Sequence, residues 1–148
     1  MQAKKILLPV DFSTAGEAAL KMATMLARDG DGTIVILHVE EPPMAYGGGE
    51  LYYGLVEPDR TELTRMLHEI KPTDPNVPVV YRLVTGDPAT AVVQAAEEEG
   101  ADFIVVGSHG RTGIGRLLMG SVAESIVRHA KCPVVTVKGP TRSPKKPS

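Results

Sequence analysis

Hydrophobic residues gather in five short runs along the chain. Four of these runs are rich in valine and isoleucine and barely alternate with polar positions: residues 5–10, 33–39, 102–107 and 133–137. Such runs are typical of strands that are covered on both faces. The fifth run, residues 77–86, carries Tyr81 and Arg82 among its valines, so we predict a strand at or near an edge of the sheet.

Between these runs, apolar residues recur every three or four positions, which is the period of a helix with one buried face. The four stripes are Ala19, Met22, Ala23 and Leu26; Leu63, Met66, Leu67 and Ile70; Ala89, Val92, Val93 and Ala96; and Leu118, Val122 and Ile126. Strands and helices therefore alternate along the chain. Regular alternation with strands buried on both faces predicts a doubly wound, Rossmann-like α/β domain, in which right-handed crossovers place helices on both faces of a five-stranded parallel sheet.

Several residues mark where the predicted helices begin and end. The start signals are Thr14 with Glu17, Asp59 with Glu62, and Asp87 followed by Pro88. The first two pairs have the spacing of a capping box, and the third combines an N-cap residue with the proline favoured at the first helical position. Gly30 and Gly100 stand where the first and third helices are expected to stop.

Two segments do not fit the alternating pattern. Residues 41–58 combine prolines, glycines and three tyrosines without periodicity; we expect a mobile loop, and either a lid over a ligand or plain disorder explains its composition. The tail, residues 139–148, is rich in proline, serine and lysine and is expected to be disordered. Residues 1–138 are thus expected to form a single α/β domain.

Composition and charge exclude several classes of function. The net charge of −2 gives no field that would favour nucleic acid or an anionic membrane. Apolar runs are too short for a membrane span or a signal-peptide core, so we expect a soluble, cytoplasmic protein. The one cysteine, Cys132, forms no internal disulfide, and the four histidines lack the spacing of metal ligands. No protein metal site is expected.

Glycines are dense between residues 107 and 121, directly after the fourth buried run. The pattern reads Gly107-x-x-Gly110, nine residues, then Gly120-Ser121. It is neither a P-loop nor the compact Gly-x-Gly-x-x-Gly of dinucleotide folds. A glycine-rich loop that leads from a strand into a helix exposes backbone N–H groups at the positive end of the helix dipole, which favours binding of a phosphate chain. Arg111 can add charge to such a site, and a solvated surface arginine explains it equally well.

The sequence resembles the ATP-binding branch of the universal stress protein family. The family signature Gly-x-x-Gly-x9-Gly-Ser/Thr is present as Gly107, Gly110, Gly120 and Ser121, and the resemblance extends over "KKILLPVDFS" near the start and over the block from "VVGSHGRTG" to "CPVVTV". This resemblance implies strand order 3-2-1-4-5, a homodimer, and ATP bound across the ends of the first and fourth strands.

The resemblance also implies roles for individual residues. It places Pro9, Asp11 and Val39 on the adenine and ribose side of the nucleotide, and Gly107, Gly110, Gly120, Ser121 and Val122 at the phosphates. Val10, between Pro9 and Asp11, and Arg111, next to Gly110, are further candidates for the binding site. An aspartate beside a triphosphate would repel it, so Asp11 makes sense toward the ribose hydroxyls or a bound cation such as Mg²⁺. A turn residue ahead of the first helix is the other explanation for Asp11.

Three functions are compatible with the sequence. The first is an ATP-binding stress-response protein in which nucleotide occupancy biases a dimer that pairs through the edge strand 133–137. The second is a weak ATPase or adenylyl-transfer enzyme, although the sequence offers no convincing base or water-orienting residue for phosphoryl transfer. The third is a nucleotide-free interaction protein, which the intact glycine pattern argues against.

Overall fold

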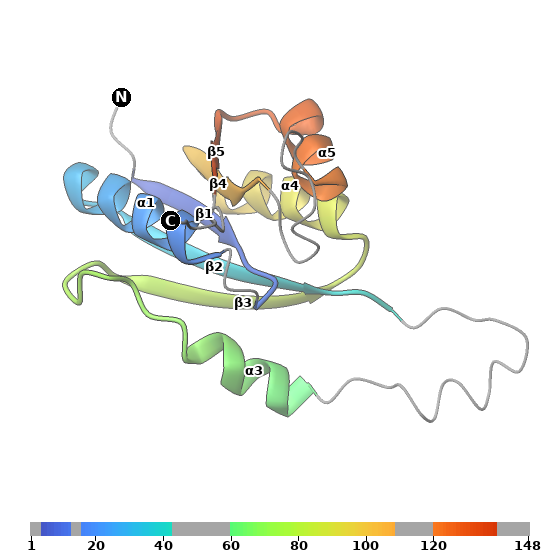
Figure 1. The fold of residues 1–148 in the computed structure, drawn as a ribbon, viewed down its shortest axis with the longest axis horizontal. Coiled ribbons are helices and arrows are strands. Elements are labelled where there is room, and N and C mark those ends of the chain that lie inside the picture. Colours follow the sequence, from blue (N-terminus) through green and yellow to red (C-terminus); the bar gives the residue numbers. More distant parts are fainter. Residues whose placement is uncertain (1–3, 13–15, 43–59, 109–119, 139–148) are drawn as a thin grey trace, which may run out of the picture.

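The computed structural model describes residues 4–12, 16–42, 60–108 and 120–138. Strands and helices alternate along them as the sequence predicts (Figure 1): β1 Lys5–Pro9, α1 Gly16–Gly30, β2 Thr33–Glu40, α3 Arg60–His68, β3 Val79–Thr85, α4 Pro88–Glu99, β4 Phe103–Gly107, α5 Ser121–His129 and β5 Val134–Val137. Residues 43–58 of the predicted loop 41–58, the predicted tail 139–148 and the start signals Thr14 and Asp59 lie outside the described residues.

The five strands form one parallel sheet in the order β3-β2-β1-β4-β5. The predicted fold class and strand order are therefore confirmed. The run 77–86 forms β3, which lies at an edge of the sheet as its mixed composition predicts. The strand built from the run 133–137 lies at the opposite edge.

Alternate strand residues enter two separate cores, one on each face of the sheet. On one face, Ile6, Leu8 and Ile36 pack with α1 and α3; on the other, Leu7 and Leu37 pack with α4 and α5. Figure 1 shows these two helix pairs on opposite sides of the sheet. Because successive side chains of a strand point to opposite faces, a strand buried on both sides needs apolar residues at every position, which explains the unbroken runs.

The ends of helices α4 and α1 show how well local sequence signals predicted where a helix begins and ends. Asp87 is the N-cap of α4, Pro88 follows it, and Gly100 ends the helix with φ 66°, all as predicted. Helix α1 ends at Gly30 as expected, but the left-handed residue after it is Asp31, with φ 58°. Aspartate tolerates this conformation better than most residues, so glycine is not needed there.

Among the described residues, no helix is long and apolar enough to cross a membrane.

Candidate functional site

The two central strands, β1 and β4, lead to helices on opposite faces of the sheet. The chain leaves β1 toward α1, which packs on one core, and leaves β4 toward α5, which packs on the other. In open α/β sheets, this switch point at the carboxyl ends of the strands is where ligands bind. A cavity of about 700 Å³ lies there, lined from the ends of β1, β2 and β4 and from the first turns of α4 and α5.

The cavity brings together most of the residues that the sequence singled out. Those that line it are Pro9, Val10, Asp11, Val39, Gly107, Gly120, Ser121 and Val122. Gly110 and Arg111 lie outside the described residues. Every predicted site residue that the structure describes therefore borders one cavity, although the segments that supply them are separated by up to about a hundred positions in the sequence.

Pro9 ends β1 at the point where β1 and β4 part. Pairing of β1 with β4 extends only to Leu7 opposite Ile104, whereas pairing with β2 continues to Pro9 opposite Leu37. The N–H of Val10 donates to the Leu37 carbonyl at 2.8 Å, so the preceding backbone nitrogen faces β4. Proline has no hydrogen to donate from that nitrogen. The missing donor thus falls on the side where the cavity opens.

Both ends of the glycine motif are tied together beside β5. The N–H of Gly120 donates to the Ser108 carbonyl at 2.6 Å, and the N–H of Ser108 donates to the Val137 carbonyl at 2.9 Å. Ser108 is only 8% exposed and also lines the cavity. Sequence reasoning did not select Ser108, and its place directly after a glycine at a strand end was the only available signal.

The site glycines do not need unusual backbone angles. Among the described glycines, Gly86 and Gly100 have positive φ, whereas Gly120 has φ −64° and ψ 160°, which any residue can adopt. Where the φ angle does not require glycine, its other advantage is that it has no side chain to obstruct a group that approaches the backbone. Gly120 borders the cavity, so the approaching group would come from there.

The amino end of α5 faces the same cavity without a side-chain cap. Gly120 is its N-cap and makes no side-chain hydrogen bond. The first intrahelical bond runs from the Glu124 N–H to the Gly120 carbonyl at 3.0 Å. The N–H groups of Ser121, Val122 and Ala123 precede that bond, and all three residues line the cavity. Three helix-terminal donors and the positive end of the helix dipole are thereby presented to one concave space.

Carboxylates occupy another part of the cavity wall. Asp11, Glu40 and Glu41 line it, and no lysine or arginine does so among the described residues. The Glu40 side chain is 8% exposed and forms an ion pair with Arg60, which also donates to the Thr85 hydroxyl at 3.2 Å. The Arg60 side chain is 52% exposed, so the pair neutralises Glu40 at the margin of the site. This pair joins the end of β2 to the start of α3, and no pattern in the sequence predicted it.

His38 is a further residue that sequence reasoning did not place in the site. It lines the cavity, is 9% exposed, and contacts the segment that follows β1 through its Nδ1, 2.8 Å from the Val10 carbonyl oxygen. A histidine inside the otherwise apolar run of β2, one residue before Val39, was the available signal.

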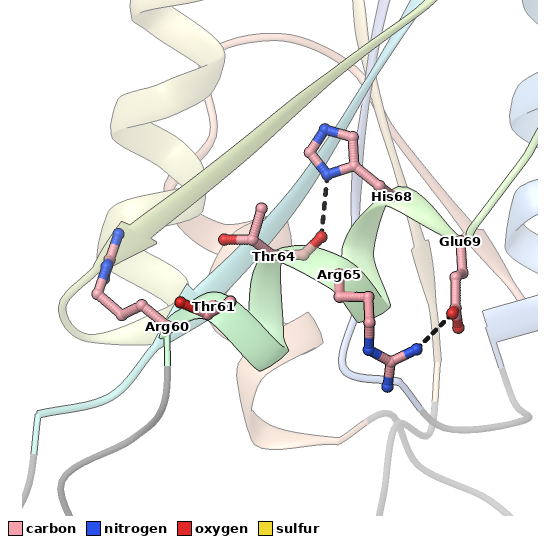
Figure 2. A pocket seen from close by; sticks show the side chains of 6 residues that line it. All are labelled: Arg60, Thr61, Thr64, Arg65, His68 and Glu69. Atoms are coloured by element: carbon pink, nitrogen blue, oxygen red, sulfur yellow. Dashed lines mark hydrogen bonds and ion pairs between the residues drawn. The ribbon is translucent and has the colours of Figure 1, made fainter.

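A second hollow, of about 600 Å³, runs along the outer face of α3. Figure 2 shows its lining, Arg60, Thr61, Thr64, Arg65, His68 and Glu69, all of which come from or directly follow that helix. Arg65 forms ion pairs with Glu62 and Glu69. The hydrogen bond that Arg65 donates to Glu62 lowers the pKa of Glu62. Since the described residues that line this open surface all belong to one segment, the cavity at the strand ends is the stronger candidate.

Comparisons with known proteins agree with this architecture. The sequence model of the universal stress protein family matches residues 2–138. Universal stress protein MJ0531 of Methanocaldococcus jannaschii is 33% identical over 144 residues, which cover 94% of this chain and 84% of the relative. The solved structure of MJ0577, a protein of the same organism, is 31% identical and superposes with a TM-score of 0.74 over the full length of both chains.

A universal stress protein solved in complex with cAMP is 26% identical, with a TM-score of 0.64 over 95% of this chain and 100% of that one. The relatives are thus similar over nearly their whole length, in the same fold, and one of them was crystallised with an adenine nucleotide. The chain belongs to the universal stress protein family.

Proposed function

We propose that this protein binds ATP in the cavity at the strand ends and acts as a nucleotide-dependent stress-response protein in the cytoplasm. The observation that carries the proposal is the uncapped amino end of α5, which faces a cavity of about 700 Å³. That volume lies within the range of about 300–1,000 Å³ that is usual for small-molecule sites. The complex of a relative with cAMP supports an adenine nucleotide as the ligand class.

The cavity offers different chemistry to each part of ATP. Phosphate oxygens would accept hydrogen bonds from the N–H groups at the start of α5, which glycine at position 120 leaves accessible. The adenine would lie against the apolar wall near Val10 and Val39, and the ribose hydroxyls would donate to Asp11. Gly110 completes the phosphate side in this proposal because it belongs to the family signature, and Arg111, which follows it, would add positive charge.

Mg²⁺ is the proposed companion of the nucleotide. It prefers oxygen ligands and usually binds through one or two carboxylates together with substrate phosphates. With Asp11 assigned to the ribose, Glu41 provides a carboxylate in the same cavity, and together with the phosphate oxygens it fits this ion. When bound, Mg²⁺ would neutralise charge on the phosphates, while the helix N–H groups orient them.

A hydrogen-bonded path connects the phosphate side with the last strand. Val137, in β5, accepts from Ser108, and Ser108 accepts from Gly120 at the start of α5. We propose that two copies of the chain pair through β5, the edge strand that follows α5. A nucleotide that shifts Gly120 would then also displace β5 through these hydrogen bonds. It would act as a switch if it bound two states of the dimer with different affinities.

The test begins with the protein as purified. Ligand released by heat and identified by chromatography is expected to be adenine nucleotide at near one per chain, and calorimetric titration of emptied protein with ATP is expected to give saturable binding that strengthens with Mg²⁺. An empty protein that also gives no heat with ATP would refute the proposal. Turnover assays with and without Mg²⁺ distinguish a switch from a slow ATPase.

Gly120→Val tests the phosphate approach directly. Valine fits the observed φ and ψ of this position, so the fold is expected to persist, while its side chain would occupy the space in front of the α5 donors. We expect ATP binding to be abolished in calorimetry. Wild-type affinity in this variant would count against the site.

A further inference from the structure

His38 lies between the two strand ends that carry the proposed nucleoside contacts. It precedes Val39 in β2 and touches the segment that follows β1 on both sides of Asp11. Its side chain is 9% exposed and lines the cavity. The proposed contacts with the phosphates and with the adenine do not involve this buried ring.

The first contact is a hydrogen bond to the residue before Asp11. His38 Nδ1 lies 2.8 Å from the Val10 carbonyl oxygen. A carbonyl oxygen can only accept, so Nδ1 carries the hydrogen and donates. The N–H of the same Val10 donates to the Leu37 carbonyl at 2.8 Å. Both polar groups of the Val10 backbone are therefore held by β2.

The second contact is to the residue after Asp11. The Phe12 and His38 rings lie 4.4 Å apart between centroids, at an interplanar angle of 40°. Phe12 has φ 64°, a left-handed conformation that is uncommon for a bulky residue and persists only where the surroundings hold it. The ring contact with His38 and packing against the core below α1 supply that hold.

These contacts fix the backbone on either side of Asp11. Phe12 keeps its packing against the core when the His38 ring is removed, so the hydrogen bond to Val10 is the contact that depends on His38. We propose that His38 is a positioning residue that sets the direction of the Asp11 carboxylate toward the ribose, and that it thereby gives the site its preference for ribonucleotides over 2′-deoxyribonucleotides. The inference rests on the proposed nucleotide site. A misplaced carboxylate would lose its hydrogen bond with the ribose 2′-hydroxyl, whereas the phosphate contacts at α5 would be unaffected.

Two substitutions separate the donor from the ring. His38→Asn places an amide nitrogen the same number of bonds from Cβ as Nδ1, so it keeps the donor and removes the ring. His38→Phe keeps an aromatic ring beside Phe12 and leaves the Val10 carbonyl without its donor. Should His38→Phe fail to fold, His38→Leu removes the donor with a smaller side chain.

The experiment is calorimetric titration of the full-length protein with ATP and with 2′-deoxyATP. We expect wild type and His38→Asn to prefer ATP by about tenfold, the value of one well-placed hydrogen bond, and His38→Phe to show a preference of about twofold or less. Affinity for 2′-deoxyATP is expected to stay near the wild-type value in all three proteins, which a general loss of structure would not allow.

A double-substitution cycle tests whether His38 acts through Asp11. In an Asp11→Asn background, His38→Phe is expected to cause no further change in the ATP preference, because the carboxylate that it positions is gone. A wild-type preference in His38→Phe, its loss in His38→Asn, or additive effects in the cycle would overturn the assignment to His38. Wild-type protein that binds neither nucleotide would instead refute the proposed function itself.

Discussion

Helices α4 and α5 both follow a strand at the carboxyl edge of the sheet and pack on the same face, yet their amino ends are built differently. At α4, Asp87 accepts from the Thr90 N–H at 3.0 Å and Pro88 removes a further donor. At α5, the N-cap is Gly120, which has no side chain with which to accept. One helix caps its first turn with a side chain of its own, whereas among the described residues the other has no side-chain cap.

The difference shows how a repeated structural unit acquires a binding site. Backbone N–H groups at a helix start need an acceptor, which is a side chain, water or a ligand. In α4 the carboxylate of Asp87 is that acceptor, and the N–H and hydroxyl of Thr90 lower the pKa of Asp87 in return. In α5 the same end borders the cavity, and we propose that a phosphate is the acceptor there. On that proposal, the absence of one side chain leaves an anion-binding helix end where the topology already offers space.

The substitution Gly120→Asp tests this difference most strongly, because it gives α5 the same kind of N-cap carboxylate that α4 has. The new carboxylate would accept from the helix N–H groups and repel phosphate. We expect ATP affinity to fall by about 100-fold, equivalent to about 2.7 kcal/mol, while the melting temperature of the empty protein stays the same or rises. Calorimetry with ATP and thermal unfolding measure the two effects.

Gly120→Asn is the matched control, because asparagine caps helices with nearly the same shape but carries no charge. Its loss of affinity should be smaller than that of Gly120→Asp. Equal ATP affinity in wild type and both variants would show that the start of α5 does not bind the phosphates.

A second prediction concerns the difference between a glycine that leaves space for a ligand and a glycine that is needed for a positive φ angle. Gly100 ends α4 with φ 66°, and a Cβ added there would meet nothing within 4 Å. Gly100→Ala should therefore cost about 1 kcal/mol through backbone strain alone, and lower the melting temperature by about 3 °C. ATP affinity should not change; a weaker affinity would mean that the glycine at the far end of α4 also affects the site.

The smallest expected effect is the loss of the α4 cap in Asp87→Ala. The pKa of Asp87 is lowered in the folded protein by its bonds with Thr90, so the stabilisation is present above the ordinary aspartate pKa of about 4 and is lost as pH falls through the lower folded value. The melting temperature of the variant should lie slightly below wild type at neutral pH, and the gap should close in acid. A gap that widens below pH 4 would contradict this assignment.

Some features of the fold were readable because they depend on near neighbours in the sequence. Asp87 with Pro88 marked the start of α4, and Gly100 marked its end, since caps involve residues within one turn. The first helix shows the limit of such signals. It ends at Gly30, but Asp31 takes the left-handed conformation, because the chain beyond the helix decides which residue must turn.

The alternation of buried strands and amphipathic helices was predictable from the sequence, because unbroken apolar runs and a period of 3.6 are local properties of the chain. The sequence also singled out the glycine motif. Only the tertiary structure decided that Asp11, Val39 and Gly120 border one cavity, that Glu40 pairs with Arg60, and that His38 holds the segment around Asp11. Those contacts join residues far apart in the sequence, and they exist because the sheet order places the ends of β1, β2 and β4 side by side.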